Sequence, residues 1–584
     1  MKELSDQTRA IIAAGLCLIV IIGWSFIYKP PKPPVTPPPS AAQATPQTPG
    51  ASGANPSAAS VSAAPAAGSA AAPAVVASDE KTVVVESDLY RVELSNRGGV
   101  VRSWLLKKYT DEGTPPRTLD VVNADLAQQS GGWPLSLQLN DPQLENAANQ
   151  ALYVISTPGG TATPQGVLSA PAEVDFQWSD GRIAVTKRLK FDKNYTANLE
   201  VSVLFDGKPL PQSVAWRGGF GDATVVSRRG SLPMQVFFSQ QSKIDTLAAA
   251  KLGQPKQPNA RNTQIGPYEY VGIEDLYFAA AFLPPAVRPG QAAGPGLSLT
   301  DWAPQLDARQ PDGKIQKTFI AEMAAGSAVP GPLDLRLYVG PKDIDLLKAM
   351  QPPLNGLVQF GWFTVIAEPL FYALRWVHNY FPNYGWCIVL LAFVLNAALF
   401  PLKAMSMRAA QKMAHVGPEI KAIQERYKKY SMRDPRKAEM NKEVMAVYSR
   451  EGINPLGSCW PQLIQFPIWF AVYRMLEYTI ELRHAPWVGW IHDLSAPDPY
   501  YILPVLLGLT GYLQTKMTPT PGVDPAQARM MSIMPLAFGF FFVFYPSGLS
   551  LYILGSYAIG ISQQWYLNRT SPLKGPSGVR GKRK

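Results

Sequence analysis

Alternating apolar and polar residues dominate the chain from about residue 81 to 340. The clearest runs are residues 82–86 (TVVVE), 90–94 (YRVEL), 182–186 (RIAVT) and 199–204 (LEVSVL). A period of two is typical of strands with one buried face. Turn sequences separate the runs, at residues 96–99 (NRGG), 179–181 (SDG) and 206–209 (DGKP). The pattern predicts a large antiparallel β-sandwich over residues 79–341.

Aromatic residues are scattered through this predicted sandwich, among them Trp104, Trp133, Trp178 and Trp216. Aromatic rings can stack on sugars, which would give the domain a binding role. Their irregular spacing instead favours ordinary packing in the core or on the surface.

Long apolar runs with helical spacing dominate the last third of the 584-residue chain. Five of them are predicted to span a membrane within a helical core at residues 383–568. The first is residues 384–402, which ends at Pro401 and is followed at once by Lys403. The others are the helix within 452–486, and residues 500–517, 532–545 and 549–567. Asn396 in the first helix is expected to be an interhelical hydrogen-bond partner. Arg474 lies in the second helix, and a charged side chain within a membrane costs free energy unless it faces protein or water. It is therefore a candidate functional residue.

A sixth apolar stretch, residues 11–28, follows Lys2 and Arg9 near the start of the chain. No small-residue cleavage site follows it at once, so residues 1–29 are expected to be a transmembrane anchor, with a cleaved signal peptide as the alternative. Residues 30–78 consist mainly of Pro, Ala, Ser, Gly and Thr. They cannot bury enough apolar surface to fold and are expected to be a tether.

The spacing of apolar residues becomes helical again over residues 342–382, where Glu368 and Pro369 are predicted to separate two helices. The second helix carries Arg375 and His378 among its apolar residues. It is expected to lie in the plane of the membrane interface, with a spanning helix as the alternative.

Residues 403–451 carry twelve Lys and Arg against six acids, and their apolar residues recur three and four apart. This pattern predicts an antiparallel helical hairpin with a turn at residues 431–435. Such a basic segment is expected to stay in the cytoplasm. A solvated charged surface is one interpretation, and contact with ribosomal RNA or a targeting factor is the other. The candidate contact residues are Lys421, Arg426, Lys428, Lys429, Arg433, Arg436 and Lys437.

The net charge of +11 is concentrated beside the apolar segments, which argues against DNA as the partner and favours a multi-pass membrane protein. The charge rule places the N-terminus, the hairpin and the basic tail 569–584 in the cytoplasm, and the β-sandwich outside. The three cysteines, Cys17, Cys387 and Cys459, offer no disulfide framework. No histidine pair has a metal-ligand spacing, so neither a metal nor a cofactor is expected.

Several motifs of the helical core resemble the YidC family of membrane protein insertases, whose core is shared with mitochondrial and chloroplast relatives. They are residues 454–461 (NPLGSCWP), 463–468 (LIQFPI), 481–486 (ELRHAP), 490–495 (WIHDLS), 500–504 (YYILP) and 544–549 (FYPSGL). The order of anchor, tether, periplasmic sandwich and five-helix core extends the resemblance over the whole chain. The resemblance implies a non-enzymatic insertase and chaperone of the bacterial inner membrane, with a hydrophilic groove open to the cytoplasm and to lipid.

The resemblance also implies nascent membrane proteins as substrates, with the ribosome, the signal-recognition-particle receptor and the Sec translocon as candidate partners. Family members commonly carry a positive residue in the groove, at the position that is Asn396 here. Because Arg474 lies at a similar depth on the next helix, we expect it to supply that charge. An ion pair with Glu477 or Glu481 is the alternative. The expected groove residues are Arg474, Asn396, Gln465, Phe466, Trp469, Tyr473, Tyr512, Tyr552, Ser556 and Gln563.

Two other function classes fit an intramembrane arginine. A secondary transporter or channel with a periplasmic binding domain would use broken helices, but no inverted repeat is apparent across the predicted spans. An intramembrane hydrolase would need a nucleophile and a base at membrane depth, and Glu477 and Glu481 lack a suitable partner in the sequence.

Overall fold

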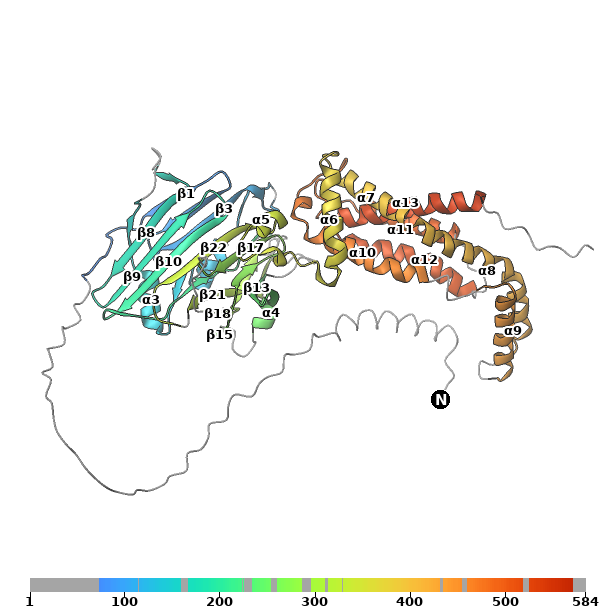
Figure 1. Ribbon diagram of the computed structural model, residues 1–584, viewed down its shortest axis with the longest axis horizontal. Helices are drawn as coiled ribbons and strands as arrows, with labels where there is room; N and C mark the ends of the chain where they lie inside the picture. The colour runs from blue at the N-terminus through green and yellow to red at the C-terminus, as the bar shows by residue number, and fades with distance from the viewer. Residues whose placement is uncertain are drawn as a thin grey trace, which may run out of the picture.

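The computed structural model describes residues 73–570, apart from residues 114, 159–165, 223, 225–233, 254–259, 286–295, 310–313, 328, 431–433, 454–459 and 518–524. The predicted anchor, most of the tether, the NPLGSC part of the first motif and nearly all of the basic tail lie outside these residues. The described chain forms a β-rich domain followed by a group of helices (Figure 1).

Three large sheets and one hairpin make up the β-rich domain. One five-stranded sheet has the order β4 (Thr118–Asp120), β3 (Val100–Thr110), β2 (Tyr90–Ser95), β1 (Thr82–Glu86) and β7 (Val167–Ser169). The ten-stranded sheet has the order β14 (Lys243–Ala248), β13 (Gln235–Gln240), β16 (Tyr270–Glu274), β17 (Phe278–Leu283), β22 (Leu333–Pro341), β10 (Thr196–Phe205), β9 (Ile183–Phe191), β8 (Ala172–Ser179) and β6 (Val154–Ser156), and β11 (Lys208–Pro209) pairs with β10. The third sheet has the order β15 (Asn262–Ile265), β18 (Leu297–Trp302), β21 (Glu322–Ser327), β12 (Ser213–Trp216) and β5 (Ser136–Gln138), and β19 (Gln305–Arg309) pairs with β20 (Ile315–Phe319).

The alternating runs form strands as predicted. In β9, for example, buried and partly exposed residues strictly alternate, because successive side chains of a strand point to opposite faces of the sheet. Gly98, Gly181 and Gly207 adopt positive φ angles of 76°, 98° and 75° at the predicted turns, a conformation that glycine reaches without a steric penalty. The paired strands of the described residues are antiparallel as predicted, except that β1 and β7 pair in parallel. Short helices, α2 (Ala124–Ser130), α3 (Pro142–Gln150) and α4 (Ala249–Leu252), were also missed between the strands.

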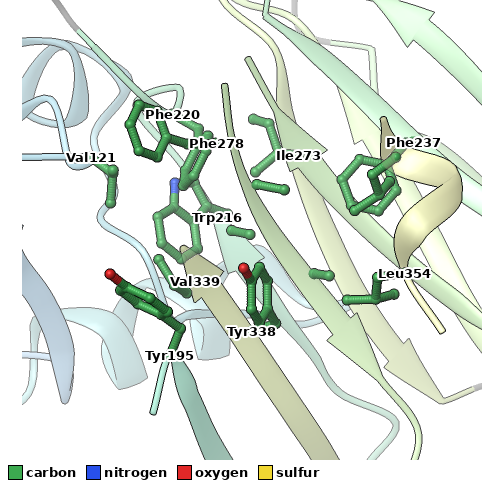
Figure 2. Close-up of a cluster of buried hydrophobic side chains, with 14 of the residues drawn as sticks. Val121, Tyr195, Trp216, Phe220, Phe237, Ile273, Phe278, Tyr338, Val339 and Leu354 are labelled. Carbon is green, nitrogen blue, oxygen red and sulfur yellow. The ribbon is translucent and has the colours of Figure 1, made fainter. Parts of the chain in front are cut away.

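Large aromatic side chains fill the core between the sheets. Trp216 packs against Phe220 with ring centroids 5.3 Å apart, within the cluster drawn in Figure 2. Trp104 and Trp178 are also buried, and the guanidinium of Arg102 lies 4.2 Å from the Trp133 ring. Trp104, Trp178 and Trp216 therefore pack in the core, as the irregular spacing favoured, and Trp133 is partly buried against Arg102.

The helical part begins with α5 (Ile344–Lys348), η1 (Asn355–Leu357), η2 (Gly361–Phe363) and α6 (Thr364–His378). It continues with α7 (Tyr384–Ala398), α8 (Phe400–Arg426), α9 (Arg436–Arg450), α10 (Trp460–Tyr478), η4 (Ile480–Leu482), α11 (Ile502–Met517), α12 (Pro525–Phe541), η5 (Phe542–Phe544) and α13 (Ser547–Thr570). In Figure 1 the pair α8 and α9 projects from the end opposite the β-rich domain. Across the described parts of residues 73–570, no single helix is long and apolar enough to cross a membrane, whereas α7 and Phe400–Met413, bent by 56°, meet that requirement together.

Two predicted helix boundaries at prolines are wrong. Pro369 lies inside the continuous helix α6, which begins at Thr364, so no break separates residues 364–378. Pro401 does not end the first long apolar helix, because α7 ends at Ala398 and Pro401 occupies the first turn of α8. The first turn tolerates proline, since its amide has no helical acceptor there.

The segment between α10 and α11 joins the helices to the β-rich domain. Arg483 makes a buried ion pair with Asp222, at 2.7 Å, and donates to the carbonyl oxygen of Thr110, also at 2.7 Å. The same segment packs on α7, where a Cβ added at Gly385 would lie 2.1 Å from the Trp487 ring. These contacts fix the segment at the junction of the two parts.

Candidate functional site

A polar cluster lies inside the group of helices where α7, α8 and α13 meet. Asn396, buried on α7, donates through Nδ2 to Ser556 Oγ at 3.1 Å. Gln563, two turns further along α13, donates through Nε2 to the carbonyl oxygen of Asn396 at 3.2 Å. Lys403 Nζ donates to Asn396 Oδ1, so a cation belongs to the same cluster. Three of the expected groove residues therefore meet, together with a lysine that was not among them.

The bend between α7 and α8 explains how Lys403 reaches Asn396. A straight helix would put residues seven apart two turns from each other along one face. Here the 56° bend after Ala398 turns α8, and the long lysine side chain extends back to the Asn396 amide. The sequence interpretation missed Lys403 because it treated Pro401 as the end of a span and the lysine as its cytoplasmic flank.

Polar side chains continue along α13 from this cluster toward the end that carries the hairpin. Gln411 of α8 donates to Asn568 Oδ1 at 2.9 Å, and Gln564 donates to the same oxygen at 3.3 Å. Gln563 Oε1 is buried and has no hydrogen-bond partner among the described atoms. A buried amide oxygen without a protein partner is a place where water binds. The seam from Ser556 to Asn568 is about 18 Å long at a rise of about 1.5 Å per residue.

Arg474 lies away from this cluster, near the β-rich domain. Its Nη1 pairs with Glu477 Oε2 at 3.0 Å, and its guanidinium lies 4.5 Å from the Tyr478 ring. Its Nη2 lies 3.5 Å from the carbonyl oxygen of Gln359, in the segment that precedes α6. The geometry is that of the ion-pair alternative, with the charge of Arg474 engaged by a carboxylate one turn away.

The remaining expected groove residues divide into separate surroundings. Trp469 stacks on Phe538 of α12 at 5.6 Å, and the Tyr473 hydroxyl donates to Glu477 at 2.8 Å. Tyr552 is buried in α13 and its hydroxyl is hydrogen-bonded to the Ser556 side chain of the polar cluster, whereas Tyr512 of α11 lies under the ammonium of Lys516. Phe466 is exposed on α10, and Gln465 beside it is partly buried. The expected groove residues are therefore divided between the polar cluster, which Tyr552 adjoins, and other surroundings, and they do not form one continuous set.

The hairpin of α8 and α9 packs through the apolar residues that the spacing predicted, including Val416, Ile420, Ile423 and Val447. Two of its basic candidates are engaged within it, since Arg426 pairs with Glu443 at 2.8 Å and Arg436 pairs with Asp434 at 2.9 Å. Lys437 Nζ lies 4.0 Å from Met440 Sδ, and Arg433 lies outside the described residues. The other three, Lys421, Lys428 and Lys429, are exposed.

Two family models match the chain. The model described as 60Kd inner membrane protein matches residues 376–574, which include the polar cluster and the hairpin. The model described as the YidC periplasmic domain matches residues 82–373, which include the β-rich domain. Together they cover both parts of the fold.

Curated relatives support the same family over most of the chain. A membrane protein insertase YidC of Cupriavidus necator is 34% identical over 500 residues, covering 83% of this chain and 82% of the relative. Another, from Citrifermentans bemidjiense, is 33% identical and covers 96% of this chain and 99% of the relative. A crystal structure described as an active YidC insertase with its first transmembrane domain resolved matches 85% of this chain at 18% identity, with a TM-score of 0.35. On the family models and the curated relatives, the chain belongs to the YidC family of membrane protein insertases.

Proposed function

We propose that this protein inserts membrane proteins into the bacterial inner membrane without enzymatic chemistry, by receiving their polar segments at the Asn396 cluster. The observation that carries the proposal is the hydrogen-bonded group of Asn396, Lys403, Ser556 and Gln563 within otherwise apolar helices. In the family context, the β-rich domain is periplasmic and the helices belong to the membrane.

The physical role of such a cluster is to shorten the dry path of a polar segment. A peptide group that enters hydrocarbon loses its water and costs several kcal/mol if nothing replaces that water. The side chains of the cluster and the seam toward Asn568 offer donors and acceptors along part of the crossing. The membrane potential favours outward movement of acidic groups by about 2.3 kcal/mol per charge per 100 mV.

Lys403 supplies the positive charge of the cluster in this proposal. Its ammonium donates to Asn396 Oδ1, at the position where the family resemblance places the cation. Arg474 has a structural role instead, because its guanidinium is engaged by Glu477 at 3.0 Å. The cation makes segments with acidic residues the favoured polar cargo.

An insertion assay in proteoliposomes tests this role with a client whose translocated tail is acidic. Lys403→Gln is expected to slow insertion about tenfold, which corresponds to about 1.4 kcal/mol of lost attraction. Asn396→Arg in the same chain should restore it, and Arg474→Gln is the matched control with a paired charge. Full activity of Lys403→Gln, or a loss confined to Arg474→Gln, would refute the assignment. A client with a neutral tail separates the loss of attraction from a loss of folding.

The finer topology also belongs to this proposal. Residues 11–28 serve as an anchor, and the five helices of residues 383–568 form the membrane core, with the hairpin and both termini in the cytoplasm. In the hairpin, Lys421, Lys428 and Lys429 present exposed charge to ribosomal RNA or a targeting factor. The signal-recognition-particle receptor and the Sec translocon are further proposed partners.

A transporter or channel is the second class, and the same proteoliposomes distinguish it. Photocrosslinkers placed at Phe466, Trp469 and Tyr552 are expected to label a stalled nascent membrane protein if the chain is an insertase. If they label only small solutes, a transporter is favoured.

A further inference from the structure

A histidine and two carboxylates meet at the junction between the β-rich domain and the helices. Glu112 follows strand β3, whereas His484 and Asp493 belong to the segment between α10 and α11. One ligand atom of each residue lies within 4.8 Å of the other two, and all three residues are partly buried. No metal-ligand spacing is visible along the chain, because two separate parts of it contribute these three residues.

Neighbouring groups hold these three side chains in place. Asp493 Oδ1 accepts from the amide of His484 at 3.1 Å and from the amide and hydroxyl of Ser495, each at 2.8 Å. His484 Nδ1 lies 2.9 Å from the hydroxyl of Thr110. Contacts of this kind fix the ring orientation of histidine ligands and the position of carboxylate ligands in metal sites.

The chemistry of the three side chains fits a divalent transition metal. A neutral imidazole ring and two carboxylates are groups that bind such metals once the metal displaces their protons. Arg483 itself is engaged by Asp222 at 2.7 Å, so its charge is already balanced. One imidazole nitrogen and two carboxylate oxygens are ligands that Zn²⁺ accepts in tetrahedral geometry.

The ligand atoms of the three side chains need to move only slightly closer together to bind one metal ion. Metal–ligand bonds of about 2.1 Å put tetrahedral ligands about 3.4 Å apart. The three atoms, within 4.8 Å of one another, reach that separation when side chains move by about an ångström. A water completes the fourth position of such a site.

We propose that Glu112, His484 and Asp493 bind one Zn²⁺ ion, which clamps the β-rich domain to the segment between α10 and α11. The clamp adds to the buried pair of Arg483 and Asp222 at the same junction. The proposed insertion function is not needed for this inference, because the site lies outside the polar cluster.

Zinc binding to the full-length chain, purified without a polyhistidine tag, provides the test. After treatment with EDTA, calorimetric titration with ZnCl₂ should give one saturable site with a Kd in the micromolar range or below. Glu112→Gln and His484→Gln should each weaken it at least tenfold. His492→Gln is the matched control, because this exposed histidine belongs to the same segment but not to the cluster.

A second measurement guards against misfolded variants. Added Zn²⁺ should raise the Tm of the unchanged chain and of His492→Gln, but not of Glu112→Gln, since a ligand stabilises only the form that binds it. The absence of saturable binding would overturn the proposal. It would also fail if the His492→Gln variant alone lost the site, or if Ca²⁺ bound as tightly as Zn²⁺ and independently of His484.

Discussion

Replacement of Asp222 by asparagine removes the negative charge that Arg483 faces at the junction. The two side chains are only 5% and 2% exposed, and Nη2 and Oδ2 are 2.7 Å apart. Breaking a buried ion pair costs about 3–5 kcal/mol, because one charge stays buried without compensation. In the variant, Arg483 would still have two other partners, the Thr110 carbonyl oxygen at 2.7 Å and the Phe278 ring at 5.5 Å, so the cost should lie at the lower end of this range. We therefore expect Asp222→Asn to destabilise the junction by about 3 kcal/mol, which corresponds to a roughly hundredfold change in its opening equilibrium.

The assay is hydrogen exchange of the full chain in detergent, read at the amides of residues 479–495 and of β3. Asp222→Asn should increase their exchange about a hundredfold relative to amides of α8 and α9. The double variant Asp222→Leu/Arg483→Met should recover most of the loss, because apolar side chains of similar volume replace a buried pair without leaving a charge. The reasoning would be refuted if Asp222→Asn left exchange unchanged, or if the Asp222→Leu and Arg483→Met effects simply added.

Three further predictions concern other parts of the structure. Gly385→Ala should lower the Tm of the full chain in detergent, because the added Cβ would lie 2.1 Å from the Trp487 ring. Gly555→Ala is the control and should leave the Tm unchanged, because its added Cβ would have its nearest neighbour at 3.6 Å. Equal Tm values for the two variants would contradict the prediction. Ile420→Ala should destabilise the hairpin by about 2–5 kcal/mol and expose α8 and α9 selectively to a protease, and uniform digestion would count against it. Burial lowers the pKa of Lys187 from 10.5 to about 7, so above pH 7 the unfolded chain binds the additional proton. Stability of the β-rich domain should therefore rise with pH up to about 10, by at most about 1.4 kcal/mol per pH unit, and a urea titration showing the same slope in Lys187→Met would refute the cause.

The local elements followed from the sequence because their causes are local. The residues of β9 alternate between buried and partly exposed, as their side chains predict. The hairpin apolar residues Val416, Ile420 and Ile423 pack as their spacing requires. The helix boundary predicted at Pro401 was misplaced because the first turn of a helix, here α8, accepts proline. The boundary predicted at Pro369 was misplaced because α6 continues through this residue.

The candidate site was only partly predictable. Asn396, Ser556 and Gln563 were expected from their polarity in apolar helices, and the structure brings them together. Lys403 was missed because its position depends on a 56° bend that no spacing rule reports. Arg474 looked available in the sequence, but its ion pair with Glu477 and the approach of Gln359 engage it.

The sequence by itself determined the two parts of the chain and its family resemblance, because hydrophobic period and motifs are properties of neighbouring residues. Only the tertiary structure decided that Arg474 is paired with Glu477, and that Lys403 supplies the positive charge of the Asn396 cluster. Lys403 meets Asn396 through a bend, and Glu112 meets His484 across the junction. Such contacts join residues from separate elements, so they depend on how helices and sheets pack and not on spacing along the chain.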